Sequence, residues 1–203
     1  NASANVDVAL TPKGIGALTG HVADNTSTGG NKRGANAVDW QTTRSNATQV
    51  ASGQNATIGG GSGNTSSNVY TTVSGGEQNV ASGVQSTVSG GFFNVASGER
   101  ATVSGGIINT ASGDYSTIVG GRGLTLSGIG SVGYNNNSNG TNDMEVTDNG
   151  TAVLGNTDLW LASNDNNNPR SLRFFGLNST PGTFDGTTNF VGFKEIGRAS
   201  CRE

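Results

Sequence analysis

Two consecutive stretches decide the fold: ASGVQSTVSGGFFNV at residues 81–95 and ASGERATVSGGIINT at residues 96–110. Both have 15 residues, and similar stretches lie on either side of them without gaps. Aligned on their Ser-Gly pairs, the copies are residues 51–65, 66–80, 81–95, 96–110 and 111–125. Self-similarity at a fixed period is typical of a solenoid, in which each repeat packs against its neighbours in a stack.

Several columns of this repeat hardly vary when Ala51 is numbered as position 1. Positions 10 and 11 are Gly-Gly in all five copies. Position 7 is always threonine: Thr57, Thr72, Thr87, Thr102 and Thr117. Position 8 is always β-branched and aliphatic: Ile58, Val73, Val88, Val103 and Ile118. Position 14 is Asn64, Asn79, Asn94 and Asn109, and then Leu124.

Position 3 is glycine in every copy except one, where Asn68 replaces it. Asparagine is the non-glycine residue that best tolerates a left-handed backbone, so this column predicts a turn with positive φ. The Gly-Gly pair predicts a second turn. Two turns in 15 residues leave two short strands per coil, which favours a flattened parallel β-roll over a triangular β-helix.

Alternation along the strands assigns faces to the columns. Position 8 is expected to point into the roll and position 7 away from it. We interpret the position 14 asparagines as an inward amide ladder that bonds to the next coil or to turn backbone. Because Leu124 ends this column and the register slips at Ser131-Val132, we expect the roll to end near Tyr134.

Composition narrows the function classes. Glycine supplies 34 of 203 residues, charged residues only 12%, and the net charge is -3. The chain therefore lacks the basic face of a nucleic-acid-binding protein. No run approaches the roughly 20 apolar residues of a membrane span, so we expect no membrane insertion by this segment.

The apolar side chains of each coil are few, which predicts association with other copies. The conformational entropy that the backbone loses on folding must be offset by burial of apolar side chains. The candidates for burial against a partner are Phe92, Phe93, Ile107 and Ile108. Alternation predicts that one residue of each pair points inward and the other outward. We favour an intersubunit surface over a ligand patch for the outward residues. The variable residues near the turns are the candidates for ligand contact: Glu99, Arg100, Asp114 and Tyr115.

The repeat resembles the head repeats of trimeric autotransporter adhesins, which form a YadA-like left-handed β-roll. Its period is one residue longer than the commonest spacing of that family. The phrasing ASGERATVSGGIINT looks closer to bacterial and phage tail-fibre-like proteins. The flanks NVDVALTPKGIGAL (residues 5–18) and LWLASNDNNNPRSLRFFGLNS (residues 159–179) also resemble that group. The resemblance implies an all-β stacked parallel roll, a homotrimer, and a C-terminal intramolecular chaperone in complete members.

The expected organisation has four parts. Residues 1–50 form a β-rich lead-in, with Trp40 as a packing anchor, and residues 51–134 form the roll. Residues 135–194 form a small antiparallel or interleaved β-module built from five short strands, of which the first two are 144–146 and 151–154. Residues 195–203 are a non-native tail, because IGRASCRE resembles translated sequencing adapter. The natural segment then contains no cysteine, which fits an extracellular protein without disulfides.

Motifs for chemistry are weak. His21 is the single histidine and has no serine-acid pattern around it. Asp143, Asp148 and Asp165 could supply oxygen ligands to calcium, but their spacing matches no calcium loop. The Gly-Gly pairs are not followed by the Lys-Ser/Thr of a phosphate-binding loop. We therefore assign no catalytic, cofactor-binding or metal-binding residue, and expect neither a cofactor nor enzyme activity.

These observations lead to an expected function in attachment. The chain is expected to be a homotrimeric adhesin or tail-fibre-like segment on a bacterial surface or phage virion, with a host receptor or glycan as possible partner and no nucleic acid. One alternative is the non-catalytic stem of an enzyme-bearing phage tailspike. Another is a monomeric ligand-binding or ice-binding solenoid, because Thr72-x-Ser74 and Thr87-x-Ser89 would place hydroxyl groups in an array.

Overall fold

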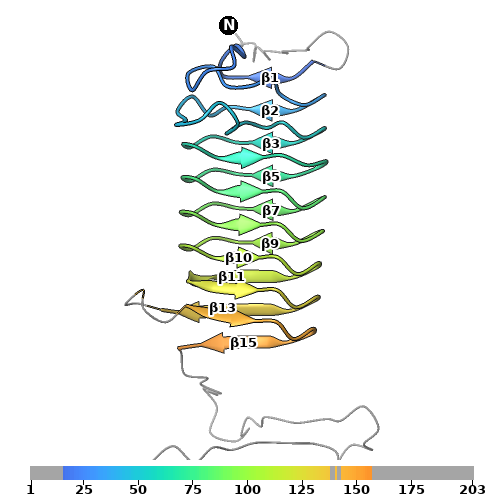
Figure 1. Ribbon diagram of the computed structural model, residues 1–203, viewed down its shortest axis with the longest axis vertical. Helices are drawn as coiled ribbons and strands as arrows, with labels where there is room; N and C mark the ends of the chain where they lie inside the picture. The colour runs from blue at the N-terminus through green and yellow to red at the C-terminus, as the bar shows by residue number, and fades with distance from the viewer. Residues whose placement is uncertain (1–15, 138–139, 141–142, 157–203) are drawn as a thin grey trace, which may run out of the picture. The chain divides into compact units, whose positions relative to one another are not determined.

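The computed structural model describes residues 16–137, 140 and 143–156, which form a stack of parallel β-coils (Figure 1). The chain passes alternately through two sheets, so the described part is an all-β solenoid with a repeat of 15 residues. The nine-stranded sheet of this part contains β1 (Leu18–Thr19), β2 (Val38–Asp39), β3 (Thr57–Ile58), β5 (Thr72–Val73), β7 (Thr87–Val88), β9 (Thr102–Val103), β11 (Thr117–Arg122), β13 (Val132–Asn136) and β15 (Ala152–Gly155). The six-stranded sheet contains β4 (Thr65–Ser66), β6 (Val80–Ala81), β8 (Val95–Ala96), β10 (Thr110–Ala111), β12 (Leu124–Leu126) and β14 (Met144–Val146).

The register of both sheets follows the sequence period. Thr72 pairs with Thr87 and Thr87 with Thr102 in the nine-stranded sheet, and Val80 pairs with Val95 in the six-stranded sheet. Position 12 adds a third ladder of single bridges, from Thr43 through Ser62, Glu77, Phe92 and Ile107 to Arg122. Each residue therefore lies above the residue with the same repeat position in the neighbouring coil.

The core is a narrow column of small and β-branched side chains between the sheets. The aliphatic residues at position 8 are fully buried, as are the alanines at position 1: Ile58, Val73, Val88, Val103, Ile118, Ala51, Ala81, Ala96 and Ala111. A β-branched residue in one sheet therefore faces alanine in the other, which lets the sheets approach closely.

The asparagines of position 14 form a buried ladder that joins consecutive coils. Asn79 Nδ2 donates to the Gly75 and Gly91 carbonyls at 3.0 and 2.9 Å, and Asn79 Oδ1 accepts the Asn94 amide at 3.0 Å. Asn64, Asn94 and Asn109 are buried in the same way. Leu124 ends the column, but the buried Asn135 takes over, since its Nδ2 donates to Arg122 O at 3.0 Å.

The prediction of positive φ at position 3 was wrong. Neither Asn68 nor the glycines of this column have positive φ; it occurs at position 5, in Asn55, Tyr70, Gln85, Arg100 and Tyr115, and again at position 13. At these positions the amide turns back to the preceding coil, as in Tyr115 N to Glu99 O at 2.8 Å. At position 3 the coils lie close together, since a Cβ at Gly98 would lie 2.3 Å from Gly113 O, although Asn68 occupies the same column in the second copy.

Both sheets extend beyond residues 51–134. Leu18–Thr19 and Val38–Asp39 pair in parallel ahead of the repeats, while Met144–Val146 and Ala152–Gly155 continue the two sheets after them. Of the two expected arrangements, antiparallel or interleaved, the antiparallel one is therefore not found for these last two strands, because the stack gives each of them a parallel partner. The three later expected strands lie outside the described residues.

The entrance of the solenoid is polar. Trp40 is 45% exposed and is not the expected packing anchor, since alternation turns its neighbours Asp39 and Gln41 inward. Asp39 and Gln41 are instead fully buried.

Candidate functional surfaces

The edge of the stack at positions 12 and 13 carries an apolar ridge formed by Phe92, Phe93, Ile107 and Ile108. These side chains are 37%, 43%, 41% and 45% exposed, respectively. The expectation that one residue of each pair points inward was wrong. Phe93 and Ile108 have φ of 55° and 56°, so strand alternation stops at this corner and both side chains of each pair point outward.

The backbone at this ridge is unfavourable for the residues it carries. A β-branched residue with positive φ is a clear outlier, and Ile108 is one. At the same position the first and last copies have Gly63 and Gly123, which adopt φ of 65° and 64° without that cost. The third and fourth copies therefore hold bulky apolar residues at a position where glycine has no steric cost, while the second copy holds Gln78 with φ of 54°.

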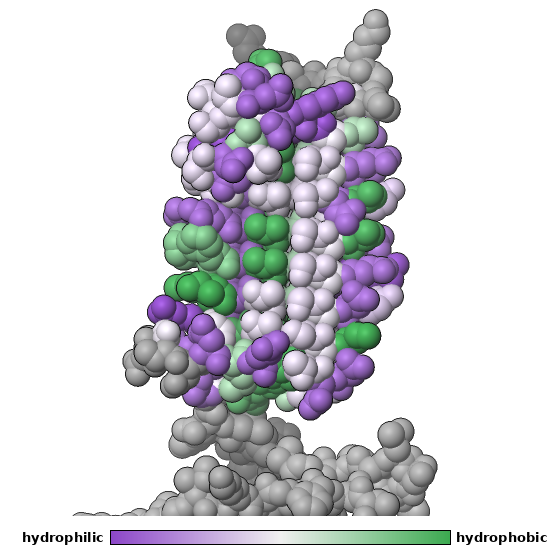
Figure 2. Space-filling model, viewed as in Figure 1, coloured by the Kyte–Doolittle hydropathy of each residue, from purple (hydrophilic) through white to green (hydrophobic). Residues whose placement is uncertain are grey.

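Further apolar surface adjoins the ridge. The Phe92 and Phe93 rings meet edge to face, with centroids 4.4 Å apart and an interplanar angle of 83°. Val80 and Val95 are partly exposed at position 15 on the outward face of the six-stranded sheet, where they pair with each other, and Val95 lies two residues after Phe93. Figure 2 shows green apolar residues at both edges of the stack and in the middle of the face between them.

Arg100 and Tyr115 lie on the other edge of the coils, at position 5, so the structure separates them from the ridge. Arg100 Nη1 donates to Tyr115 Oη at 2.7 Å and Nε to Gln85 Oε1 at 2.8 Å. The guanidinium also lies 5.4 Å from the centre of the Tyr115 ring and pairs with Glu99 at 2.9 Å. This exposed cluster bonds across three coils, from Gln85 through Arg100 to Tyr115.

The outward face of the nine-stranded sheet is a hydroxyl array. The threonines at position 7 stack in register and are partly exposed, beside the exposed Ser74, Ser89 and Ser104 of position 9. Val119 and Val132 interrupt the array toward the C-terminal coils, where they are exposed.

Before the repeats, a buried charged cluster surrounds Asp39. Arg33 Nε donates to Asp39 Oδ2 at 2.8 Å, and Arg44 Nη2 lies 4.0 Å from the same oxygen. Gln41 holds the first repeat through Nε2 to Asn64 O at 2.8 Å. Burial lowers the pKa of Arg44, and the Arg33 charge lowers it further, against the opposite effect of Asp39. Sequence reasoning missed this cluster, although alternation across Asp39, Trp40 and Gln41 would have placed the carboxylate inside.

The candidates for chemistry lie apart from one another. His21 Nδ1 lies 2.9 Å from Thr28 O in an exposed loop. In the same loop, hydrogen bonds from Thr26 are the main cause that lowers the pKa of Asp24. Asp143 contacts Asn137 at 3.3 Å, Asp148 is exposed, and Asp165 lies outside the described residues. Within the described ranges, no three His, Cys, Asp or Glu side chains are grouped as metal ligands.

Two findings complete the description. Nowhere in the described part does a helix have the length and apolarity that crossing a membrane requires. Comparisons with protein families, with curated proteins and with solved structures find no match to this chain.

Proposed function

We propose that this chain is a structural and attachment segment that assembles as a homotrimer, in an adhesin or tail-fibre-like protein of a bacterial surface or phage virion. The observation that carries the proposal is the apolar ridge of Phe92, Phe93, Ile107 and Ile108. Large exposed apolar residues on adjacent coils are typical of an interaction surface. Two of the four, Phe93 and Ile108, have positive φ, and their retention there supports a role outside the monomer, since the strain lowers the stability of the isolated chain.

A second copy is the occupant that this surface fits best. The ridge is free of charged side chains over the two coils, and the partly exposed Val80 and Val95 extend it across the neighbouring face. Because every coil has the same period, copies laid side by side can repeat the same contact from coil to coil. Burial of the ridge between copies would offset the small apolar core of each coil.

Sedimentation velocity over a range of protein concentrations tests this proposal. We expect the unmodified chain to form a trimer and the double variant Phe93→Asn/Ile108→Asn to remain a monomer. Asparagine tolerates positive φ better than phenylalanine or isoleucine. The free energy of unfolding of the monomer should therefore stay the same or rise by up to about 1 kcal/mol. Loss of association with retained stability would then report on the surface and not on unfolding.

The matched control is Tyr70→Asn on the opposite edge. Tyr70 is also exposed and has φ of 58°, so this substitution makes the same backbone change away from the ridge. It should leave the trimer intact. A monomeric unmodified chain at high concentration, or a trimer that survives the double variant, would contradict the proposal.

The hydroxyl array supports a second candidate, a monomeric solenoid that binds a repetitive ligand such as ice. Thermal hysteresis of the unmodified chain tests it directly. The variant Thr87→Leu/Thr102→Leu should abolish the activity, whereas Phe93→Asn/Ile108→Asn should retain it. Absence of hysteresis in the unmodified chain would reject this candidate.

A further inference from the structure

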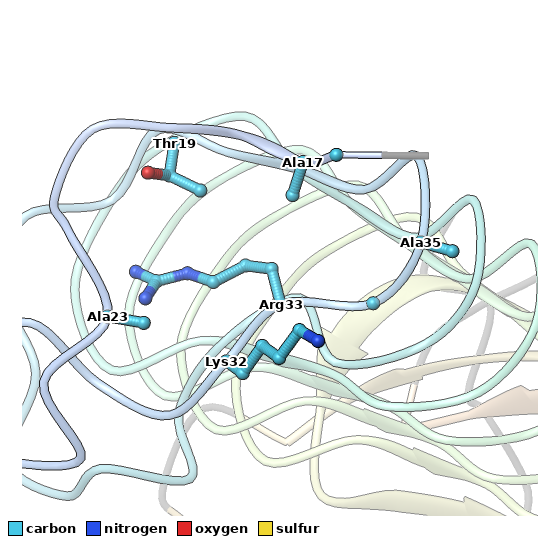
Figure 3. A pocket seen from close by; sticks show the side chains of 8 residues that line it. Ala17, Thr19, Ala23, Lys32, Arg33 and Ala35 are labelled. Atoms are coloured by element: carbon cyan, nitrogen blue, oxygen red, sulfur yellow. The ribbon is translucent and has the colours of Figure 1, made fainter. Parts of the chain in front are cut away.

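A pocket lies at the entrance of the solenoid, but it offers few groups to a ligand. Its volume is about 550 Å³, and its lining includes Thr19, Lys32, Arg33 and three alanines (Figure 3). The Arg33 side chain is 1% exposed, and its Nη2, which has no hydrogen-bond partner among the residues that the structure describes, is buried. Lys32 is therefore the one charged group of this lining that a ligand could reach. The edge of the repeats at position 5 presents a larger set of exposed groups.

A row of four large side chains projects from this edge, which lies opposite the apolar ridge. Tyr70, Gln85, Arg100 and Tyr115 occupy position 5 of four successive coils, and all four are exposed. Their φ values lie between 55° and 60°, and each amide donates to a carbonyl of the preceding coil, as in Arg100 N to Val84 O at 2.8 Å. Because the four backbones are alike, the side chains leave the edge one above another at a coil spacing of about 4.8 Å. We call these four residues the position 5 row.

The backbone of the row does not favour large side chains. Asparagine and glycine tolerate positive φ best, and they occupy position 5 at the two ends of the array, as Asn55 with φ of 55° and Gly130 with φ of 66°. The four coils between them instead carry tyrosine, glutamine, arginine and tyrosine. Retention of such residues on four successive coils supports a role for them at the surface of the folded chain.

The side chains of the row are planar at their ends and are partly fixed in place. Arg100 Nε donates to Gln85 Oε1 at 2.8 Å, and Arg100 Nη1 donates to Tyr115 Oη at 2.7 Å. These bonds order the middle of the row before a ligand arrives, which lowers the conformational entropy lost on binding. Tyr70 and Tyr115 are 56% and 53% exposed and place an aromatic ring at each end.

Hydroxyl groups accompany the row at the same spacing. The threonines of position 7 follow two residues later in each coil and are partly exposed. They stack in register, Thr72 with Thr87 and Thr87 with Thr102. Each of the four coils therefore presents one planar side chain and one hydroxyl group.

The charges on this edge favour an uncharged ligand. Arg100 is the single cationic residue at positions 4 and 5 of the five copies, and its Nη1 lies 2.9 Å from Glu99 Oε1. Asp114 adds a second carboxylate, whose Oδ1 accepts the Glu99 amide at 2.9 Å. The edge thus has two negative charges and one positive charge, which disfavours an anionic partner.

We propose that the position 5 row binds an uncharged, extended oligosaccharide of β-1,4-linked sugars, with one sugar to each coil. The C–H faces of a sugar ring pack on planar side chains, and its hydroxyl groups bond to polar atoms at the edges of those side chains. Successive rings of a β-1,4-linked chain lie in an extended line and advance by a distance close to the coil spacing of about 4.8 Å. An α-1,4-linked chain curves and cannot follow a straight row. The proposal rests on the attachment role proposed above and names the class of its partner, but it does not require a trimer.

Isothermal titration calorimetry of the complete chain with cellotetraose and with chitotetraose tests the proposal. Maltotetraose, the α-1,4-linked isomer of cellotetraose, is the comparison ligand. We expect saturable binding of a β-1,4-linked probe that is at least about tenfold tighter than that of maltotetraose. The affinity should rise from the disaccharide to the tetrasaccharide, since the row spans four coils. Failure of both β-1,4-linked probes to bind, or equal binding of maltotetraose, would overturn the proposal.

Two double variants assign the binding to the row. Tyr70→Asn/Tyr115→Asn should weaken binding by about tenfold, because both aromatic contacts are lost, and should not lower the melting temperature, because Asn55 fits the same position. Phe93→Asn/Ile108→Asn is the matched control on the opposite edge and should leave binding unchanged. Binding that survives the tyrosine variant would overturn the proposed site.

The same measurements separate this proposal from trimer formation. A monomeric chain that binds a β-1,4-linked probe would contradict the trimer alone. A trimer that binds neither β-1,4-linked probe would contradict the oligosaccharide site alone.

Discussion

At the scale of single residues, position 6 offers a direct test of buried polarity. Ser86 and Ser116 occupy this position and both are fully buried. Ser116 Oγ donates to Gly113 O at 2.6 Å, whereas Ser86 Oγ has no partner in the described part of the chain. Alanine fits the same column, as Ala56 and Ala101 show.

We therefore expect opposite effects from the two alanine substitutions. Ser86→Ala should raise the free energy of unfolding by about 1 kcal/mol, because an unsatisfied buried hydroxyl is removed. Ser116→Ala should lower it by about 1 kcal/mol, because a hydrogen bond is lost. Equilibrium denaturation measures both values. Equal losses in the two variants would mean that Ser86 Oγ has a partner.

Two glycines with different surroundings allow a second test. A Cβ at Gly98 would lie 2.3 Å from Gly113 O, while a Cβ at Gly75 would meet no described atom within 4 Å. Gly98→Ala should lower the free energy of unfolding by about 1–3 kcal/mol, the usual cost of overpacking, or more, since the obstructing atom is backbone. Gly75→Ala should change it little, and thermal unfolding of the two variants would show the difference. If the two variants were equally stable, close approach of the neighbouring coil would not be the reason for glycine at position 3.

The glycine columns show a feature that could not be predicted from the sequence, namely which glycines have positive φ. Glycine is required either for positive φ or for close approach of another chain segment, and a column of letters does not separate the two causes. Asn68 at position 3 favoured positive φ as the cause. The structure instead shows close approach at this position, because the backbones of neighbouring coils meet there. Positive φ instead occurs at Tyr70, Arg100 and Tyr115, which are residue types that do not predict a left-handed backbone.

At the scale of the elements, the asparagine ladder links each turn to the following coil. Asn94 donates to Gly90 O and Gly106 O at 3.0 and 2.9 Å, and its Oδ1 accepts the Asn109 amide at 3.0 Å. These hydrogen-bonding groups lie inside the stack, at the turn that connects the nine-stranded sheet to the six-stranded sheet. The ladder thus replaces the hydrogen bonds that the short strands cannot make there.

Loss of one ladder member should be severe. Asn94→Ala leaves the Asn109 amide and a turn carbonyl without their partner, so we expect a loss of about 2–4 kcal/mol in the free energy of unfolding. Asn94→Asp keeps the shape and the acceptor but removes both donors, and should cost at least as much because the carboxylate is buried. Denaturation in urea measures both losses. A loss below 1 kcal/mol for each variant would mean that water replaces the ladder.

The elements themselves were largely predictable, because the 15-residue period determines which residues stack. Position 8 and position 14 are inside, as alternation and side-chain chemistry indicate. The ridge was only partly predictable, since the left-handed residues Phe93 and Ile108 break the alternation on which the inference relied. The pocket beside Arg33 was not predictable, because it forms where three segments without a shared pattern meet: residues 16–19, 23 and 32–35.

At the scale of the whole molecule, the described coils form a linear array in which each coil pairs only with the coils before and after it. The stability of such an array is approximately a sum of coil and interface contributions. Removing one complete repeat should therefore preserve the register of both sheets, since the residues on either side have the same repeat positions. Removing half a repeat should place outward residues in the core and prevent folding.

Two complete-repeat deletions separate folding from assembly. Deletion of residues 66–80 joins Thr65 to Ala81 and keeps the whole ridge, whereas deletion of residues 96–110 joins Val95 to Ala111 and removes Ile107 and Ile108. We expect both shortened chains to fold, with similar melting temperatures slightly below that of the unmodified chain.

Only the second deletion should weaken self-association in sedimentation velocity, because only it shortens the apolar ridge. Deletion of residues 66–72, about half a repeat, is the control that should fail to fold by circular dichroism. Equal association of the two complete-repeat deletions would place the contact between copies elsewhere on the solenoid.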